Sequence, residues 1–279
     1  MEQAYVGIST PDQTTCRART HAEPAAFSRA NDHVRHRNDA QIETEAWLAL
    51  AESVNDGGPV THSIRVGVLA ARLGLEIGLS SIDIVALDLG ARLHDIGKVF
   101  IPASILLSPD KLDEISREEM QTHAVKGAEL LSRAKCAAVR AAAPVARHHH
   151  ERWDGSGYPD HLAGEGIPLA ARITALADVY DALRSERSYK SAWSHADAVR
   201  EIEAGKGCHF DPALADIFLQ MLERQISGEG RPLYVTDDEL TAGEQPMASI
   251  SIVTIAREKM RGRRLTAPPR QPTTFSPPS

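Results

Sequence analysis

The chain reads, from residue 148 to residue 159, His148-His149-His150-Glu151-Arg152-Trp153-Asp154-Gly155-Ser156-Gly157-Tyr158-Pro159. An Ala-rich segment of helical character precedes the three imidazoles, and a Gly-rich turn follows them at once. Imidazole nitrogen suits first-row transition metals, and glycine lets the backbone approach a ligand closely. The stretch predicts a metal site where a helix passes into a loop, with a polar surface turn as the alternative. The histidines and carboxylates elsewhere in the chain decide between the two.

The composition is that of a globular protein with a substantial core. The 279 residues are 42% hydrophobic, enough for one large domain with tails. There is no apolar run as long as about 18 residues, and the N-terminus lacks a basic region and an apolar core, so we expect no membrane span, no signal peptide and a cytoplasmic location. The three cysteines are odd in number and far apart, which argues against a disulfide framework and a Cys-based zinc site. The net charge of -7 argues against a nucleic-acid polymer as partner.

Apolar patterning divides the chain into three segments. Residues 1–40 have no sustained apolar period, so we expect a flexible N-terminal extension. Residues 41–227 have helical periodicity and predict an all-α domain. Residues 228–279 lose that period and end in a basic, Pro-rich tail. Two helices have predicted caps: Ser81 is the N-cap of a helix that runs from residue 81 to the His94-Asp95 pair, and Ser116 with Glu119 forms a capping box for a helix that runs from residue 116 past His123. The other expected helices cover residues 41–54, 60–77, 169–183, 195–204 and 212–225.

Polar groups occur at the ends of these apolar helices. His62 lies in the first turn of its helix, where a single histidine is ordinarily a surface or capping residue. The helix from Ser81 ends in His94-Asp95-Ile96-Gly97-Lys98. An imidazole, a carboxylate and an ammonium are costly to bury together unless they pair or bind metal. Metal binding is the more economical interpretation of this segment.

Two carboxylates share one face of the helix expected over residues 169–183. Asp178 and Asp181 are three residues apart and therefore lie on the same side. Asp178 falls between Ala177 and Val179, in a run that otherwise has the composition of a buried segment. This placement favours a paired or metal-ligating carboxylate over a solvated acidic stripe.

The candidate ligands form one donor set spread over consecutive helices. Its five imidazoles and two carboxylates exceed the needs of one tetrahedral zinc ion, and nitrogen and oxygen donors without thiolate suit two octahedral ions such as Fe or Mn. Two metals about 3.5 to 4 Å apart can share a bridging hydroxide for in-line attack on phosphorus. The predicted chemistry is phosphoester hydrolysis. The donor set is His62, His94, Asp95, His123, His149, His150 and Asp178.

Three motifs in this chain, in order, resemble those of the HD-GYP family of the HD phosphohydrolase superfamily. They are His94-Asp95-Ile96-Gly97-Lys98, His149-His150-Glu151 and Gly155-Ser156-Gly157-Tyr158-Pro159. The resemblance extends over residues 41–225. It implies an HD-type helical bundle that hydrolyses cyclic di-GMP, a bacterial second messenger, to pGpG, with slow further cleavage to GMP. It also implies that the seven residues of the donor set are metal ligands, with Asp95 bridging the two ions.

The resemblance assigns further roles to residues outside the donor set. Lys98 would face the attacking hydroxide and the scissile phosphate, where an ammonium stabilises the developing negative charge. Arg187 and Lys190 would hold the phosphates, Tyr158 would border the guanine pocket, and Asp181 would orient the ligands. His148 is expected to lie outside the ligand set.

One position departs from part of the family. Members that hold a third metal have a glutamate four residues before the first histidine, whereas this chain has Gly58 there, followed by Pro59 instead of the usual threonine. Glycine offers no ligand, so we predict a site for two ions and pGpG as the main product.

Two other functions remain open at this point. The substrate could be another cyclic dinucleotide, such as a mixed GMP-AMP molecule. The domain could also be a non-hydrolysing adaptor that binds a cyclic dinucleotide, or a diguanylate cyclase through its Gly-Tyr-Pro loop. The intact donor set argues against the adaptor, because a binding module does not require seven metal ligands.

Overall fold

The structure is a computed structural model, and it describes residues 25–54, 61–186 and 191–226. The chain divides into two units, residues 1–39 and 40–279. Only the second unit carries the candidate ligands, and it is described by itself below. Residues 1–24 and 227–279 of the predicted tails lie outside the described residues, so the three-segment division of the chain stays a proposal.

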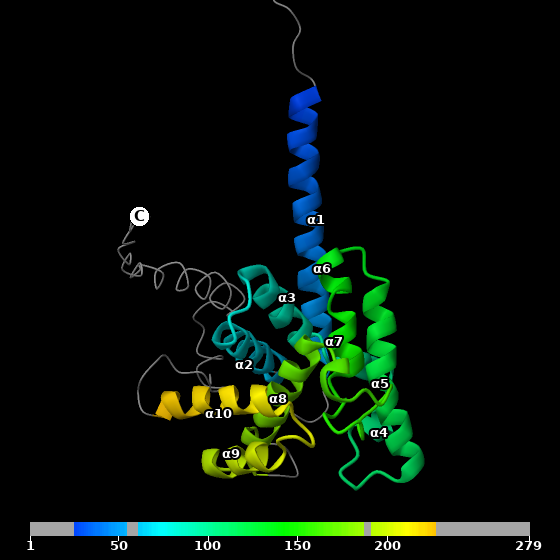
Figure 1. Ribbon diagram of the computed structural model, residues 1–279. Coiled ribbons are helices and arrows are strands. Elements are labelled where there is room, and N and C mark those ends of the chain that lie inside the picture. The colour runs from blue at the N-terminus through cyan, green and yellow to red at the C-terminus, as the bar shows by residue number, and fades with distance from the viewer. Residues whose placement is uncertain (1–24, 55–60, 187–190, 227–279) are drawn as a thin grey trace, which may run out of the picture. The chain divides into compact units, whose positions relative to one another are not determined.

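The described residues form helices joined by loops (Figure 1). Among these residues there is no strand, and the only β-type pairing is an isolated bridge between Lys206 and Phe210. The predicted all-α fold class is therefore confirmed. The α-helices are α1 (Ala25–Ser53), α2 (His62–Glu76), α3 (Ser81–Arg92), α4 (Ala103–Leu106), α5 (Glu114–Ser132), α6 (Ala137–Arg140), α7 (Ala143–His148), α8 (Leu169–Arg184), α9 (His195–Ala204) and α10 (Pro212–Ile226), with 3₁₀ helices η1 (Ile96–Phe100) and η2 (Gly164–Gly166).

The structure differs from the prediction at the start of α1 and at the caps of α3 and α5. The helix expected from Gln41 begins at Ala25, because residues 25–40 are rich in alanine and arginine, which favour a helix without an apolar stripe. The cap of α3 is Ser80 instead of Ser81, and its side chain accepts the Asp83 amide. The cap of α5 is Asp113, whose carboxylate accepts the Ser116 amide at 2.8 Å, so Ser116 lies inside the helix.

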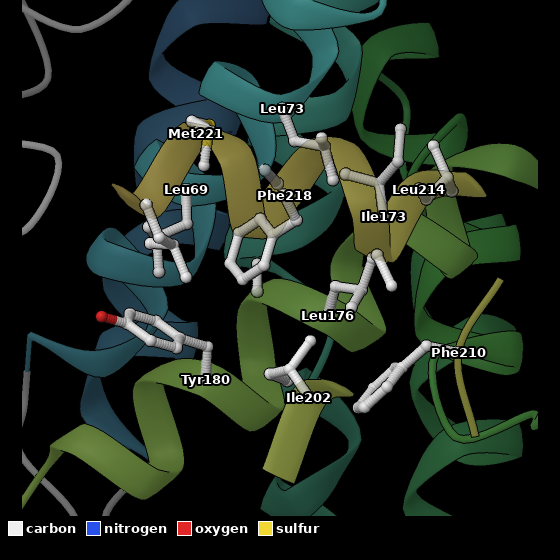
Figure 2. Packing of buried hydrophobic residues seen from close by; sticks show 14 of the residues in the cluster. Leu69, Leu73, Ile173, Leu176, Tyr180, Ile202, Phe210, Leu214, Phe218 and Met221 are labelled. Carbon is white, nitrogen blue, oxygen red and sulfur yellow. The ribbon is translucent and has the colours of Figure 1, made fainter. Parts of the chain in front are cut away.

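A first hydrophobic cluster joins α2, α8, α9 and α10 (Figure 2). Leu69 and Leu73 of α2 meet Ile173 and Leu176 of α8, and Phe218 of α10 lies among them, with every one of these side chains at most 1% exposed. Burying large apolar side chains is the main favourable contribution to folding. This cluster fixes the positions of the helices that carry His62 and Asp178.

A second hydrophobic cluster joins α3, η1, α5, α6 and α7, with the end of α1 packed against it. Helix α3 contributes to both clusters. Leu87 and Ala91, four residues apart on one face, belong to the first cluster, while Leu89 and Leu93 on another face belong to the second. The helix is therefore the shared wall between the clusters, and the His94-Asp95 pair follows directly at its end.

The backbone of η1 packs directly on α5. A Cβ atom at Gly97 would lie 2.0 Å from the His123 carbonyl oxygen and 2.6 Å from the Gly127 amide nitrogen. Only glycine permits an approach this close. The contact sets Asp95, which immediately precedes η1, beside His123.

Among the described residues, no helix combines the length and the apolar character needed to cross a membrane.

Candidate metal centre

The candidate ligands come from five places in the fold. His62 is the first residue of α2, the His94-Asp95 pair follows α3, and His123 lies in the middle of α5. His149 and His150 follow α7, and Asp178 lies on α8. His94, His123 and His149 are at most 1% exposed. Each ligand therefore sits on, or directly after, a helix that a hydrophobic cluster holds in place.

Asp95 lies at the centre of the site, and its two oxygens face different histidines. Its Oδ2 atom is 3.2 Å from His94 Nε2 and 2.6 Å from Lys98 Nζ. Its Oδ1 atom is 3.3 Å from His123 Nε2 and 3.6 Å from His149 Nε2. A carboxylate placed in this way can bind two cations at once, one on each oxygen.

The donor atoms form two groups that share Asp95. Within each group the donor atoms lie within 4.8 Å of one another. Asp178 adds to one of them, because its Oδ1 atom is 3.2 Å from His62 Nε2 and 3.7 Å from His94 Nε2. We call the two groups position 1 and position 2. Position 1 comprises His62, His94, Asp95 and Asp178, and position 2 comprises Asp95, His123, His149 and His150.

Two donor atoms at the centre lack hydrogen-bond partners although they are buried. They are His94 Nε2 and Asp95 Oδ1. Buried polar atoms without partners are uncommon and costly, and each one calls for an explanation. A cation at each position would satisfy both atoms, and mixed nitrogen and oxygen donors suit divalent first-row metals. The residues present therefore fit two divalent ions.

Hydrogen bonds on the far side of the rings aim the imidazoles into the site. Three of the rings donate from Nδ1 to a backbone carbonyl three residues earlier, which leaves Nε2 free as the donor to a metal. The bonds run from His94 to Ala91 O (2.6 Å), from His123 to Met120 O (2.7 Å) and from His149 to Ala146 O (3.0 Å). His62 instead bonds through Nδ1 to Asp181 Oδ2, at 2.7 Å.

Position 1 concentrates negative charge. Burial alone would lower the pKa of His62, but hydrogen bonds to Asp178 and Asp181 outweigh it and raise that pKa to about 10. Burial likewise opposes ionisation of Asp178, yet His62 and His94 hold its pKa well below the ordinary range. In the absence of metal, a proton on His62 compensates part of the charge that a cation would otherwise neutralise.

Two imidazoles of position 2, those of His149 and His150, favour the neutral form. Burial lowers the pKa of His149, and burial together with the neighbouring rings lowers that of His150 well below its usual value. Although burial opposes ionisation of Asp95 too, the charges of Lys98 and His94 hold its pKa well below the ordinary range. Neutral imidazole and ionised carboxylate are the protonation states that metal binding requires.

The Gly-rich loop brings Tyr158 over the site. The ring of Tyr158 stacks on His150, with centroids 4.8 Å apart and an interplanar angle of 29°. Burial and the charges of Asp95 and Asp178 raise the pKa of Tyr158, so its hydroxyl remains protonated. The buried Glu151 anchors the loop by accepting the amides of Asp160 at 2.8 Å and Leu162 at 3.1 Å.

The remaining predicted residues are placed less centrally or lie outside the described part of the chain. His148 lies apart from positions 1 and 2, with its Nδ1 atom 3.8 Å from Glu151 and 3.6 Å from Asp160. Arg187, Lys190 and the departure at Gly58 and Pro59 fall on residues that the structure does not describe. Their predicted roles stay predictions.

Sequence reasoning missed Arg65, which reaches the site from α2. Its guanidinium donates from Nε to Asp181 Oδ1 at 2.6 Å and from Nη2 to Oδ2 at 3.1 Å, and the residue is 3% exposed. The signal was present in the sequence, since Arg65 lies between Ile64 and Val66 and three residues after His62. A buried arginine is almost always paired, so an arginine in an apolar run is a candidate partner for a carboxylate of the site.

A small cavity of about 30 Å³ adjoins position 1. It is large enough for a water molecule. Its lining includes His62, His94, Asp95 and Lys98, together with Glu52 and Arg92, which pair with each other at 2.8 Å. A water molecule therefore has room beside position 1.

Residues 40–214 match the model of the family described as HD domain. The match spans more than half of the chain, so this protein belongs to the HD domain family, as its resemblance to HD-GYP proteins predicted. Over 182 residues it is 44% identical to the cyclic di-GMP phosphodiesterase response regulator RpfG of Xanthomonas campestris, a match that covers 65% of this chain and 48% of the relative. Over 180 residues it is 44% identical to the 3'3'-cGAMP-specific phosphodiesterase 2 of Vibrio cholerae, covering 64% and 34%.

The chain thus spans no more than about half the length of these two curated relatives. Among solved structures, a cyclic GMP-AMP specific phosphodiesterase of V. cholerae, V-cGAP3, aligns with a TM-score of 0.51 and 23% sequence identity, over 78% of this chain and 58% of that one. At this identity the likeness supports the shared helical HD fold alone.

Proposed function

We propose that this protein is a metal-dependent phosphodiesterase that hydrolyses cyclic di-GMP to pGpG. The observation that carries the proposal is Asp95, whose two oxygens face two separate groups of buried imidazoles. Two divalent ions, with Fe or Mn as the best match to the donors, would occupy positions 1 and 2. Such a pair supplies an activated water nucleophile and neutralises charge on a scissile phosphate.

The protein's own residues would orient the substrate and stabilise the charge that develops on it. Lys98 lies at the rim of position 1 with its Nζ atom 2.6 Å from Asp95. An ammonium group there can stabilise the negative charge that builds up on a phosphate oxygen during in-line attack. Tyr158 presents an aromatic face stacked on His150, which supports a role in binding a nucleobase by stacking. Arg187 and Lys190 are proposed to hold the phosphates.

The relatives leave two candidates for the second base of the substrate. The matched part of this chain is equally identical to a cyclic di-GMP phosphodiesterase and to a 3'3'-cGAMP-specific enzyme. We propose cyclic di-GMP on the motifs of the HD-GYP family, and mixed cyclic GMP-AMP is the second candidate. A diguanylate cyclase domain is a further proposed partner of the loop that carries Tyr158.

Product analysis tests the activity and the substrate together. Anaerobically purified, Mn- or Fe-loaded protein is incubated with cyclic di-GMP or with 3'3'-cGAMP, and the products are resolved by chromatography. We expect pGpG to accumulate from cyclic di-GMP, GMP to form slowly, and a chelator to stop both. If 3'3'-cGAMP is hydrolysed faster than cyclic di-GMP, the proposed substrate is wrong. If neither dinucleotide is hydrolysed, the proposed enzymatic activity is wrong.

Replacing His94-Asp95 with Ala-Ala distinguishes the proposed enzyme from the adaptor alternative. The proposed enzyme loses hydrolysis in this variant, because both metal positions lose a ligand. An adaptor would retain its binding partner and would show no hydrolysis before the substitution either. Metal counting on the purified wild-type protein is the companion measurement, and three ions per chain would contradict a site for two.

A further inference from the structure

His62 differs from His94, His123 and His149 in how its ring is held. His94, His123 and His149 each donate from Nδ1 to a carbonyl of the preceding helical turn. His62 is the first residue of α2, so no turn of that helix precedes it. Its Nδ1–H is accepted instead by a side chain, Asp181 Oδ2, at 2.7 Å. The orientation of His62 therefore depends on where that carboxylate is fixed.

Asp181 is held by a buried network of side chains. Arg65 donates to both of its oxygens, at 2.6 and 3.1 Å. The Ser185 hydroxyl accepts from Arg65 Nη2 at 2.7 Å and donates to Asp181 Oδ2 at 3.1 Å. Arg65 Nη1 also donates to the Thr61 hydroxyl at 2.6 Å. Asp181 is 0%, Arg65 3% and Ser185 5% exposed.

The network fixes the plane of the carboxylate and compensates its charge. A two-point contact between guanidinium and carboxylate is stronger and more directional than a single hydrogen bond. Because Arg65 lies three residues after His62, α2 supplies both the ligand and the side chain that positions the ligand's partner. With its oxygens taken by Arg65, Ser185 and His62, Asp181 acts as an acceptor for imidazole, while Asp178 remains available to an ion.

We propose that Arg65 and Ser185 are positioning residues for position 1. They hold Asp181 so that His62 carries its proton on Nδ1 and presents Nε2 to the ion. The inference rests on the two-ion site of the proposed function and adds that the two positions depend on different kinds of support. Backbone carbonyls orient two imidazoles of position 2, whereas a side-chain network orients His62 in position 1. Loss of the network therefore weakens one ion and spares the other.

The test is the Mn²⁺ content and affinity of the full-length Arg65→Met variant. Methionine keeps much of the apolar length of the side chain and removes every donor. Dissociation constants are measured by calorimetry on metal-free protein, and bound Mn²⁺ is counted by elemental analysis after equilibration at fixed free metal. Removing an outer partner of a ligand typically costs about 10- to 100-fold in metal affinity. We expect a loss of that size for one ion and an unchanged constant for the other.

Electron paramagnetic resonance gives a readout that a general loss of stability does not produce. Two neighbouring Mn²⁺ ions are magnetically coupled, whereas a single remaining ion has the hyperfine pattern of an isolated centre. We expect Arg65→Met to convert the coupled spectrum into the isolated one at intermediate free metal. In the His150→Ala background, which weakens position 2, the same substitution is expected to abolish binding of the remaining ion.

Two further variants separate positioning from folding. Arg172→Met is the matched control, because Arg172 also pairs with a buried carboxylate, Asp211, at 2.7 Å, and lies outside both donor groups. It should leave both dissociation constants unchanged. Ser185→Ala removes one contact to Asp181 and is expected to weaken the same ion by a smaller factor, so it decides the question if Arg65→Met does not fold.

If Arg65→Met leaves the Mn²⁺ dissociation constants of both ions unchanged, the positioning role is wrong and the proposed function still stands. The same conclusion follows from Ser185→Ala if only that variant folds. An equal loss for both ions also overturns the positioning role, because the network would then support the site as a whole. A wild-type protein that binds fewer than two ions overturns the two-ion function and, with it, this inference.

Discussion

Asp88 is a buried acid on α3 that the metal site does not use. It is 3% exposed and lies against α2, where a Cβ atom at Gly67 would come 2.7 Å from its Oδ1 atom. Burial raises its pKa to about 6, against the opposing charge of Arg92. Between its ordinary pKa near 3.8 and about 6, the folded chain holds a proton that the unfolded chain has released. The free energy of unfolding therefore falls as the pH rises through this window.

Replacing Asp88 with asparagine should remove the loss of stability that ionisation of the buried carboxyl group causes. A rise in pKa from 3.8 to about 6 corresponds to at most about 3 kcal/mol above the window. We expect Asp88→Asn to be more stable than wild type by up to that amount at about pH 7.5, and the difference to shrink towards about pH 4. Urea unfolding across this range measures it, with the exposed Asp110→Asn as control. A stability difference that does not change with pH would refute the assignment.

Residue types alone marked the candidate donor set, and the resemblance marked Asp181 as a residue that orients it, but neither pointed to Arg65. The structure brings together His62, His94, His123 and the other marked side chains, because an imidazole or carboxylate in an apolar segment stands out wherever it occurs. Arg65 acts through Asp181, 116 residues away in sequence. A partner at that separation is set by the packing of α2 on α8, which no local pattern contains.

At the level of elements, the contact between η1 and α5 tolerates no added atom at Gly97. A Cβ atom there would lie 2.0 Å from the His123 carbonyl oxygen, which belongs to the backbone and cannot turn aside. We expect Gly97→Ala to lower the free energy of unfolding by about 3 kcal/mol, the upper part of the usual range for overpacking. Metal affinity should fall as well, since Asp95 immediately precedes η1.

Chemical unfolding and metal titration measure the two effects. Gly166→Ala is the control, because no atom lies within 4 Å of the added methyl group. Equal stabilities for the two alanine variants would show that η1 can move away from α5 without cost.

The Gly-rich loop depends on one carboxylate. Glu151 is 2% exposed and accepts two loop amides, so Glu151→Gln leaves one of them facing an amide group that cannot accept. A buried donor without a partner costs about 1 to 3 kcal/mol. We expect the loop with Tyr158 to loosen, the KM for cyclic di-GMP to rise and the bound metal to stay at the wild-type level.

Steady-state kinetics and metal analysis on the same preparation test this prediction. The exposed Glu165→Gln on η2 provides the comparison. Loss of metal with an unchanged KM would assign Glu151 to the donor groups instead of the loop.

Helix bodies followed from apolar periodicity, while helix ends did not. Helices α8, α9 and α10 begin and end within about a residue of the predicted bounds, because Gly, Pro and Ser mark those boundaries locally. At α3 and α5 the cap is decided by which side chain reaches a free amide, and Ser80 and Asp113 do so where later serines had been predicted. The long start of α1 has helix-forming residues without an apolar stripe, so periodicity could not find it.

For the whole molecule, bound metal should raise the stability of the fold. Ions that bind the folded chain and not the unfolded one add about 2.7 kcal/mol per site at a hundredfold excess over the dissociation constant. We expect Mn²⁺ to raise the midpoint of thermal unfolding and a chelator to return it to the metal-free value. The Ala-Ala replacement of His94-Asp95 should make the midpoint insensitive to either treatment, and a wild-type midpoint unaffected by Mn²⁺ would contradict the site.

The all-α class could be predicted because periodicity sums over many residues. The division into two hydrophobic clusters could not. Leu87 and Leu89 of α3 are alike in sequence, and only the tertiary arrangement sends one into each cluster. The distribution of the ligands between the clusters was hidden for the same reason.

That division gives the two metal positions different histories during folding. Position 2 takes all of its donors from segments of the second cluster, whereas position 1 also needs His62 and Asp178, which the first cluster carries. If the proposed ions bind, a chain in which only the second cluster has formed would already hold all four donors of position 2. Binding of the other ion would require α2 and α8 to have docked against α3. Stepwise loading would thus serve as a checkpoint, and hydrolytic competence would arrive last, with the completed fold.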